Sequence, residues 1–70
     1  MTDRRSIRKR LQYIKKAQKE HIECIQRITG ELMELEDLKP SVRKVIDALM
    51  TLAQTLEISI DLCERILEEI

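Results

Sequence analysis

The sequence is poor in the residues that build strands, tight turns and disulfide frameworks. Its 70 residues include one Gly, one Pro, one Tyr and two Cys, and no Trp or Phe. Two cysteines do not make a disulfide scaffold. A chain of this length forms a single domain, residues 1–70, and so small a domain buries little core without disulfides, a metal or oligomerisation. These scarcities predict an all-α fold that works as an oligomer or as part of a complex.

A long hydrophobic run is also missing. The longest uncharged stretch covers residues 48–56, far short of the ~20 apolar residues of a membrane-spanning helix. The N-terminus is basic and no apolar segment follows it, which argues against a signal peptide. We therefore expect a soluble, intracellular, cytoplasmic protein with no membrane role.

What the sequence does contain is helix-forming residues in a regular apolar pattern. Leu, Ile, Glu, Lys, Arg and Gln dominate it, and most of them favour helix. In the first half, the apolar positions alternate at spacings of four and three, and two polar residues fill slots in the series. The series is Ile7, Leu11, Ile14, Gln18, His21, Ile25, Ile28, Leu32 and Leu35. It predicts one continuous helix over about 3–38, capped by Thr2 or Asp3, with Gly30 on its outer face.

Pro40 marks the boundary between two helices. Proline disfavours helical geometry at Lys39 and suits the first position of a new helix. The apolar phase slips here too, because the first series would continue at Lys39 whereas the second begins at Val42. The sequence therefore predicts a turn around residues 37–41 and a second helix over about 40–70, folded back antiparallel. The expected core of this helix is Val42, Val45, Leu49, Leu52, Leu56, Ser59, Cys63, Ile66 and Ile70.

The apolar stripe of the second helix is broader than one hairpin seam needs. A stripe this broad fits a bundle of three or more helices. Two hairpins related by a two-fold axis form such a bundle. We therefore expect a homodimer, an antiparallel four-helix bundle that resembles, in architecture alone, the dimeric hairpin bundles of the Rop type. The expected interface with the second copy or a partner is Ile46, Leu49, Ala53, Leu56, Ile60, Cys63 and Leu67.

Polar residues interrupt both predicted cores at one level. If the chain turns near Lys39, Gln18 meets Ser59, and His21 is one step away. Such a polar core layer of Gln18, Ser59 and His21 would fix the register of the helices at some cost in stability. The same pairing separates the two cysteines by about 15 Å along the axis, which excludes an intrachain disulfide.

The net charge is zero but unevenly distributed. Residues 1–20 carry a net charge of +6, residues 21–39 carry −3 and residues 40–70 carry −3. Antiparallel contact between two copies of the first helix sets basic against acidic halves, which favours the antiparallel dimer. The basic segment could instead bind nucleic acid, or simply balance the acidic end of the second helix, and Tyr13 is the one aromatic residue near it. Its cations are Arg4, Arg5, Arg8, Lys9, Arg10, Lys15, Lys16 and Lys19.

Patterns of catalytic or metal-binding residues are scarce. There is no Glu-x-x-His pair, no glycine-rich loop and no nucleophile–base pattern at a readable spacing, so no catalytic residue is assigned and an enzyme is not expected. His21 and Cys24 lie three apart on one helical face, and two copies could supply four zinc ligands. No second motif of metal-ligand spacing accompanies them, so neither a metal nor another cofactor is expected.

These observations leave three functions open. The first is a non-enzymatic protein–protein interaction module, an adaptor, regulator or assembly factor, acting as a homodimeric four-helix bundle. The second is a nucleic-acid-binding regulator that uses the basic N-terminal helix. The third is a chaperone-like subunit whose wide stripe accepts a helix of a partner protein.

Overall fold

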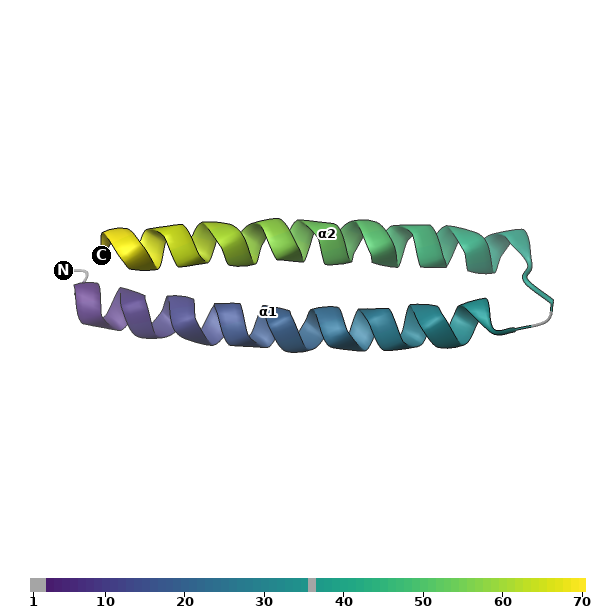
Figure 1. Cartoon of the computed structure of the whole chain (residues 1–70), viewed down its shortest axis with the longest axis horizontal. Coiled ribbons are helices and arrows are strands. Elements are labelled where there is room, and N and C mark those ends of the chain that lie inside the picture. The colour runs from purple at the N-terminus through teal and green to yellow at the C-terminus, as the bar shows by residue number, and fades with distance from the viewer. Residues whose placement is uncertain (1–2, 36) are drawn as a thin grey trace.

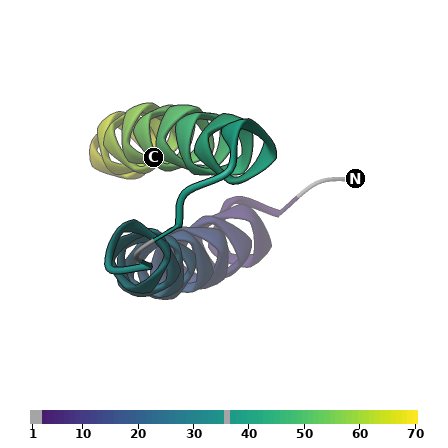
Figure 2. The ribbon, with the colours of Figure 1, turned by 90° about the vertical axis from the view of Figure 1, so that its right-hand side faces the viewer.

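The computed structural model describes residues 3–35 and 37–70, which form two antiparallel helices. Helix α1 spans Arg4–Met33 and helix α2 spans Pro40–Glu69, each with 30 residues. The start of α1 and the end of α2 lie at one end of a rod of 54 × 19 × 14 Å, and the connection between the helices lies at the other (Figure 1). Seen from the connection, the described residues form a single layer of two helices (Figure 2). The predicted all-α hairpin is confirmed.

Asp3 caps α1 at its N-terminus. Its backbone is extended, with φ −87° and ψ 130°, and its carboxylate accepts a hydrogen bond from the backbone N–H of Arg5 at 3.2 Å. This bond satisfies one of the N–H groups that the first turn of a helix leaves without a partner. The predicted cap at Asp3 is confirmed, and Thr2, the other candidate, lies outside the described residues.

Helix α1 ends at Met33, earlier than the predicted end near residue 38. Its last turn tightens, because the N–H of Glu34 donates to the carbonyl of Glu31 at 3.2 Å and that of Leu35 to the carbonyl of Leu32 at 3.3 Å. The apolar pattern continues past this end, since Leu38 is half-buried although it is not helical. Apolar periodicity alone does not distinguish a helical residue from one that folds over the end of a core.

Pro40 occupies the first position of α2, as predicted. The preceding Lys39 is extended, with φ −69° and ψ 152°, and its carbonyl accepts hydrogen bonds from the N–H groups of Val42 and Arg43 at 3.0 and 3.2 Å. The connection between the helices covers residues 34–39 and is longer than the predicted turn. Proline fits at this position because its missing N–H would have no partner in the first turn.

Gly30 lies within α1 and does not interrupt it, which confirms the continuous helix. The residue is exposed, and a Cβ atom built on it would meet no atom within 4 Å. Neither a close approach nor a special backbone conformation therefore requires glycine at this position.

The core of the hairpin is thin. Among the described residues, the buried hydrophobic side chains are Ile22, Ile25, Ile46 and Cys63, with exposed fractions of 4% to 8%. Thr29 is buried with them, and its hydroxyl donates to the carbonyls of Ile25 and Gln26, at 2.8 and 3.0 Å. The accessible surface is 5950 Å² for 8.3 kDa, whereas a compact monomer of that mass exposes about 4,600 Å². The single hairpin thus leaves an unusually large surface uncovered.

Candidate interaction surface

The two helices meet along a seam with a seven-residue repeat. In each helix, the half-buried and buried positions alternate at spacings of four and three, the pattern of an antiparallel coiled coil. The seam of α1 contains Leu11, Lys15, Gln18, Ile22, Ile25, Thr29 and Leu32. The seam of α2 contains Val42, Ile46, Leu49, Ala53, Leu56, Ile60, Cys63, Leu67 and Ile70.

The seam of α1 differs from the predicted one by one column of residues. The apolar spacing predicts Ile14 and Ile28 in the contact with α2, but both side chains are exposed. The residues one position later, Lys15, Ile22 and Thr29, take their place. The physical reason is the width of the apolar stripe. A stripe made of three columns, each a set of residues seven positions apart, contains two different pairs of neighbouring columns, and either pair could form the seam.

The seam of α2 is shifted in the same way. Val45, Leu52 and Ile66 belong to the predicted core but are exposed. The seven residues expected to face another copy line the seam with α1, where Ile46 and Cys63 are buried by the single hairpin. Those seven residues are Ile46, Leu49, Ala53, Leu56, Ile60, Cys63 and Leu67. Among the exposed apolar side chains of α2, Val45, Leu52 and Ile66 form one column directly beside the seam, whereas Met50, Ile58 and Leu62 are exposed at other positions of the helix.

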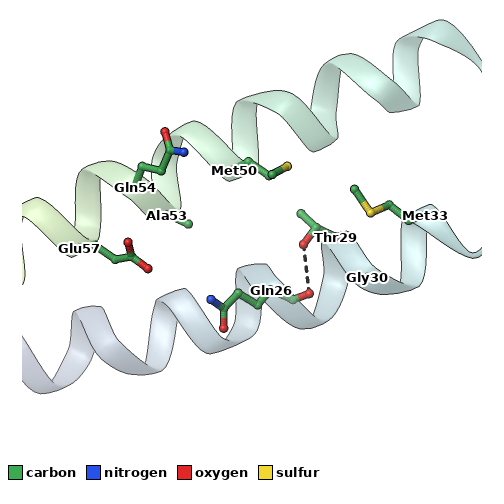
Figure 3. Close-up of a pocket in the computed structure, with 8 residues that line it drawn as sticks. All are labelled: Gln26, Thr29, Gly30, Met33, Met50, Ala53, Gln54 and Glu57. Carbon is green, nitrogen blue, oxygen red and sulfur yellow. Dashed lines mark hydrogen bonds between the residues drawn. The ribbon is translucent and has the colours of Figure 1, made fainter.

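One side of the hairpin carries a mostly polar surface, which we call the polar flank. Figure 3 shows a shallow pocket on this side, between Gln26 and Met33 of α1 and Met50 and Glu57 of α2. These residues belong to columns that repeat every seven positions beside the seam. The polar flank comprises Gln12, Lys19, Gln26, Met33, Arg43, Met50, Glu57 and Glu64.

The opposite side of the hairpin is apolar, and we call it the apolar flank. The polar flank borders the seam on one side in both helices. The residues that border the seam on its other side, in α1 and in α2, therefore lie together on the opposite side of the hairpin. The apolar flank comprises Ile7, Ile14, His21, Ile28, Leu35, Val45, Leu52, Ser59 and Ile66. Six of its large hydrophobic side chains are 39% to 52% exposed. Exposed apolar side chains gathered on one side of a protein are typical of an interaction site.

The register of the hairpin aligns the two columns of the apolar flank. Lys15 Nζ lies 3.4 Å from Glu64 Oε1, which fixes the level of α1 against α2. Steps of seven residues preserve this register in antiparallel helices. Ile14 is thus at about the level of Ile66, Ile28 at that of Leu52 and Leu35 at that of Val45. His21 and Ser59 lie at one level between the first two pairs. The apolar flank has one polar level with apolar levels on both sides.

The residues of the expected polar layer lie in different surroundings. Gln18 and Ser59 are half-buried, whereas His21 is exposed on the apolar flank. No hydrogen bond joins these side chains in the part of the chain that the structure describes. Gln18 Oε1 is buried in the seam without a hydrogen-bond partner. An unsatisfied buried oxygen of this kind typically costs about 1–3 kcal/mol.

The basic N-terminal segment stays largely exposed to solvent. Of its eight cations, Lys15 is half-buried and the other seven are exposed. Lys15 pairs with Glu64, and the second ion pair within residues 3–35 and 37–70 joins Arg65 to Asp61 in α2 at 3.1 Å. Contact with the acidic end of α2 thus pairs one cation of the segment. The ring of Tyr13 is 74% exposed and lines a shallow apolar pocket with the neighbouring basic side chains.

Sites for metal or disulfide chemistry are not assembled by the described residues. Cys24 is exposed and Cys63 is buried, and both thiols are free. The described residues bring together no group of three or more His, Cys, Asp or Glu side chains that could hold a metal ion. Neither described helix is long and apolar enough to cross a membrane.

Comparison of the chain with protein-family models, with curated proteins and with solved structures finds no match. The class of the molecule therefore rests on its own geometry. It is an antiparallel two-helix hairpin with a thin seam, a polar flank and an apolar flank.

Proposed function

We propose that this chain is a non-enzymatic protein–protein interaction module, an adaptor, regulator or assembly factor that works as a homodimeric four-helix bundle. The observation that supports this proposal is the apolar flank, on which six large hydrophobic side chains are 39% to 52% exposed along one side of the rod. A hairpin with one apolar side lacks the second layer of helices that a stable domain packs against such a side.

The surface area agrees with a missing partner layer. The 5950 Å² of the chain exceeds the expectation for a compact monomer by about 1,350 Å². A standard interface covers about 800 Å² on each partner. The excess is thus large enough for a stable dimer, and two hairpins stacked on their apolar flanks form a closed four-helix bundle.

The proposal is tested by charges placed on the two flanks. We expect the wild-type protein to have a dimer mass in size exclusion with light scattering. Ile28→Glu combined with Leu52→Glu buries charges in the interface and should give a monomer. The matched control, Gln26→Glu combined with Gln54→Glu, adds the same charges near the polar pocket and should leave the dimer mass unchanged.

A second measurement covers the case in which the monomer unfolds. Dimerisation coupled to folding makes the melting temperature rise with protein concentration. We expect this dependence for the wild type over a hundredfold range of concentration. A wild-type monomer whose melting temperature is independent of concentration would contradict the dimer. The occupant of the apolar flank would then be sought in a helix of a different protein.

The second candidate function is nucleic-acid binding by a regulator. It is favoured by the seven exposed cations of the N-terminal segment and by the exposed ring of Tyr13 beside Lys9 and Arg10. Phosphates pair with Lys and Arg, and bases stack on aromatic rings.

Fluorescence anisotropy with labelled single- and double-stranded oligonucleotides tests this candidate. Binding should weaken steeply with added salt and should be lost when Arg8, Lys9 and Arg10 are replaced by Gln. The control replaces Arg43 and Lys44, near the connection, by Gln and should bind as the wild type does. Equal binding by both variants would exclude the N-terminal segment as the binding surface.

A further inference from the structure

We infer that the second copy packs on the apolar flank with its connection at the opposite end of the bundle. In this arrangement α1 lies antiparallel to α1 of the second copy, and the two-fold axis passes at the level of His21. The inference rests on the proposed homodimer and adds its orientation. It also places the two basic N-terminal segments at opposite ends of the assembly.

The apolar flank is complementary to itself under this symmetry. Ile14 and Ile28 each lie seven residues from His21, so Ile14 of one copy meets Ile28 of the other. On α2, Leu52 and Ile66 are likewise seven residues on either side of Ser59. Apolar side chains therefore meet apolar side chains, and the polar residues meet at the axis. Packing with both connections at the same end would also match polar with polar, so packing alone does not decide the orientation.

The net charge of the two halves of the hairpin favours one orientation. The half of the hairpin that carries both termini, residues 1–20 and 55–70, has a net charge of +2. The half that carries the connection, residues 21–54, has a net charge of −2. With connections at opposite ends, positive halves lie against negative halves. With connections at the same end, each basic segment lies beside the acidic end of α2 of the second copy, but the two halves of net positive charge share one end of the bundle. The net charge of the halves therefore disfavours that arrangement.

A specific ion pair follows from the same geometry. Arg10 and Glu31 are exposed, and both belong to the helical column that borders the apolar flank on the outside of α1. They lie at similar distances on either side of His21, so Arg10 of one copy comes next to Glu31 of the other. The two-fold axis repeats this pair. With both connections at the same end of the bundle, the neighbour of Arg10 would be Glu69 instead.

Distance measurement between two spin labels tests the orientation directly. The labelled protein carries Glu34→Cys, Cys24→Ser and Cys63→Ala, so that one label sits just beyond α1 on each copy. With connections at opposite ends, the labels are about 39 Å apart along the bundle at 1.5 Å per residue. With connections at the same end, they are separated by the bundle width alone, about 20 Å.

The outcomes separate the inference from the proposed function. A dimer with a distance near 40 Å supports both. A dimer with a distance near 20 Å overturns the orientation and leaves the proposed dimer standing. A monomer without a label–label distance overturns the dimer and the orientation with it.

Charge reversal provides a second test without labels or cysteine changes. Arg10→Glu should weaken the dimer about tenfold, since two pairs are lost and like charges are opposed. Adding Glu31→Arg should restore the wild-type dissociation constant, whereas adding Glu69→Arg should not. Rescue by Glu69→Arg and not by Glu31→Arg would overturn the inferred orientation.

Discussion

The two flanks of the hairpin are built from the same helices with the same seven-residue repeat, yet they differ in chemistry. The polar flank presents Gln, Glu, Lys and Arg around two methionines, whereas the apolar flank presents Ile, Leu and Val around His21 and Ser59. Water solvates the first surface well and the second poorly. The difference is what the proposed dimer requires, in which the polar flank faces solvent and the second copy covers the apolar flank.

The largest expected effect comes from the seam, which both flanks depend on. Ile25 is 4% exposed, and Ile25→Ala should lower the free energy of unfolding by about 2–4 kcal/mol because it leaves a cavity that the neighbours fill only in part. Thermal and chemical denaturation followed by circular dichroism measure this loss. The loss should persist at every protein concentration, since the side chain packs within one hairpin.

The matched change on the apolar flank is Ile28→Ala, which removes the same atoms three positions along α1. We expect a smaller loss, about 1–2 kcal/mol, and we expect it to act through the dimer. Sedimentation equilibrium should show a dissociation constant raised about tenfold or more. A loss as large as that of Ile25→Ala, with unchanged association, would place Ile28 in the hairpin core and would remove the distinction between seam and flank.

Gly30 lines the pocket on the polar flank, so a substitution there tests whether that flank stays exposed to solvent. A Cβ added there meets nothing within 4 Å, and alanine in a helix interior is favoured over glycine by about 1 kcal/mol. Gly30→Ala should therefore raise the melting temperature by a few degrees without changing the dimer mass. A fall in the melting temperature, or a change in mass, would show that the polar flank is covered in the assembly.

The smallest expected effect belongs to the ion pair between the helices. Lys15 and Glu64 keep 30% and 44% of their side-chain surface exposed, and partly exposed pairs contribute about 0.2–1 kcal/mol. Lys15→Gln should cost no more than this, and the loss should shrink in 1 M salt. A double-mutant cycle with Glu64→Gln isolates the pair. A coupling well above 1 kcal/mol would mean that the pair is shielded from water in the assembly.

Local signals predicted several features of the fold correctly. Asp3 as a cap, the continuity of α1 through Gly30 and the start of α2 at Pro40 each depend on backbone chemistry within a few residues. The end of α1 was predicted too late, because Leu35 and Leu38 continue the apolar pattern beyond the last helical turn. Local chemistry therefore located the helices better than apolar spacing did.

The choice of seam was predicted less well, and the two helices differ in why. In α2, the column that faces α1 is apolar throughout, with Ile46, Ala53, Ile60 and Leu67. The alternative column is interrupted by Ser59, so the sequence contained a signal for the observed seam. In α1, the observed column is less apolar than the rejected one, because it contains Lys15 and Thr29. The hydrogen bonds of Thr29 to its own helix and the pairing of Lys15 with Glu64 make that column acceptable.

The sequence by itself determined that this chain is a hairpin of two long helices with a basic N-terminal segment and more apolar surface than one seam uses. Helix propensity, capping, the position of proline and the distribution of charge are local properties. They can be predicted without knowing which residues of the other helix pack against them. The tertiary structure alone decided which column of α1 enters the seam and which is left on the apolar flank. That choice depends on the joint packing of two helices, in which each side chain is buried or exposed according to what the other helix presents.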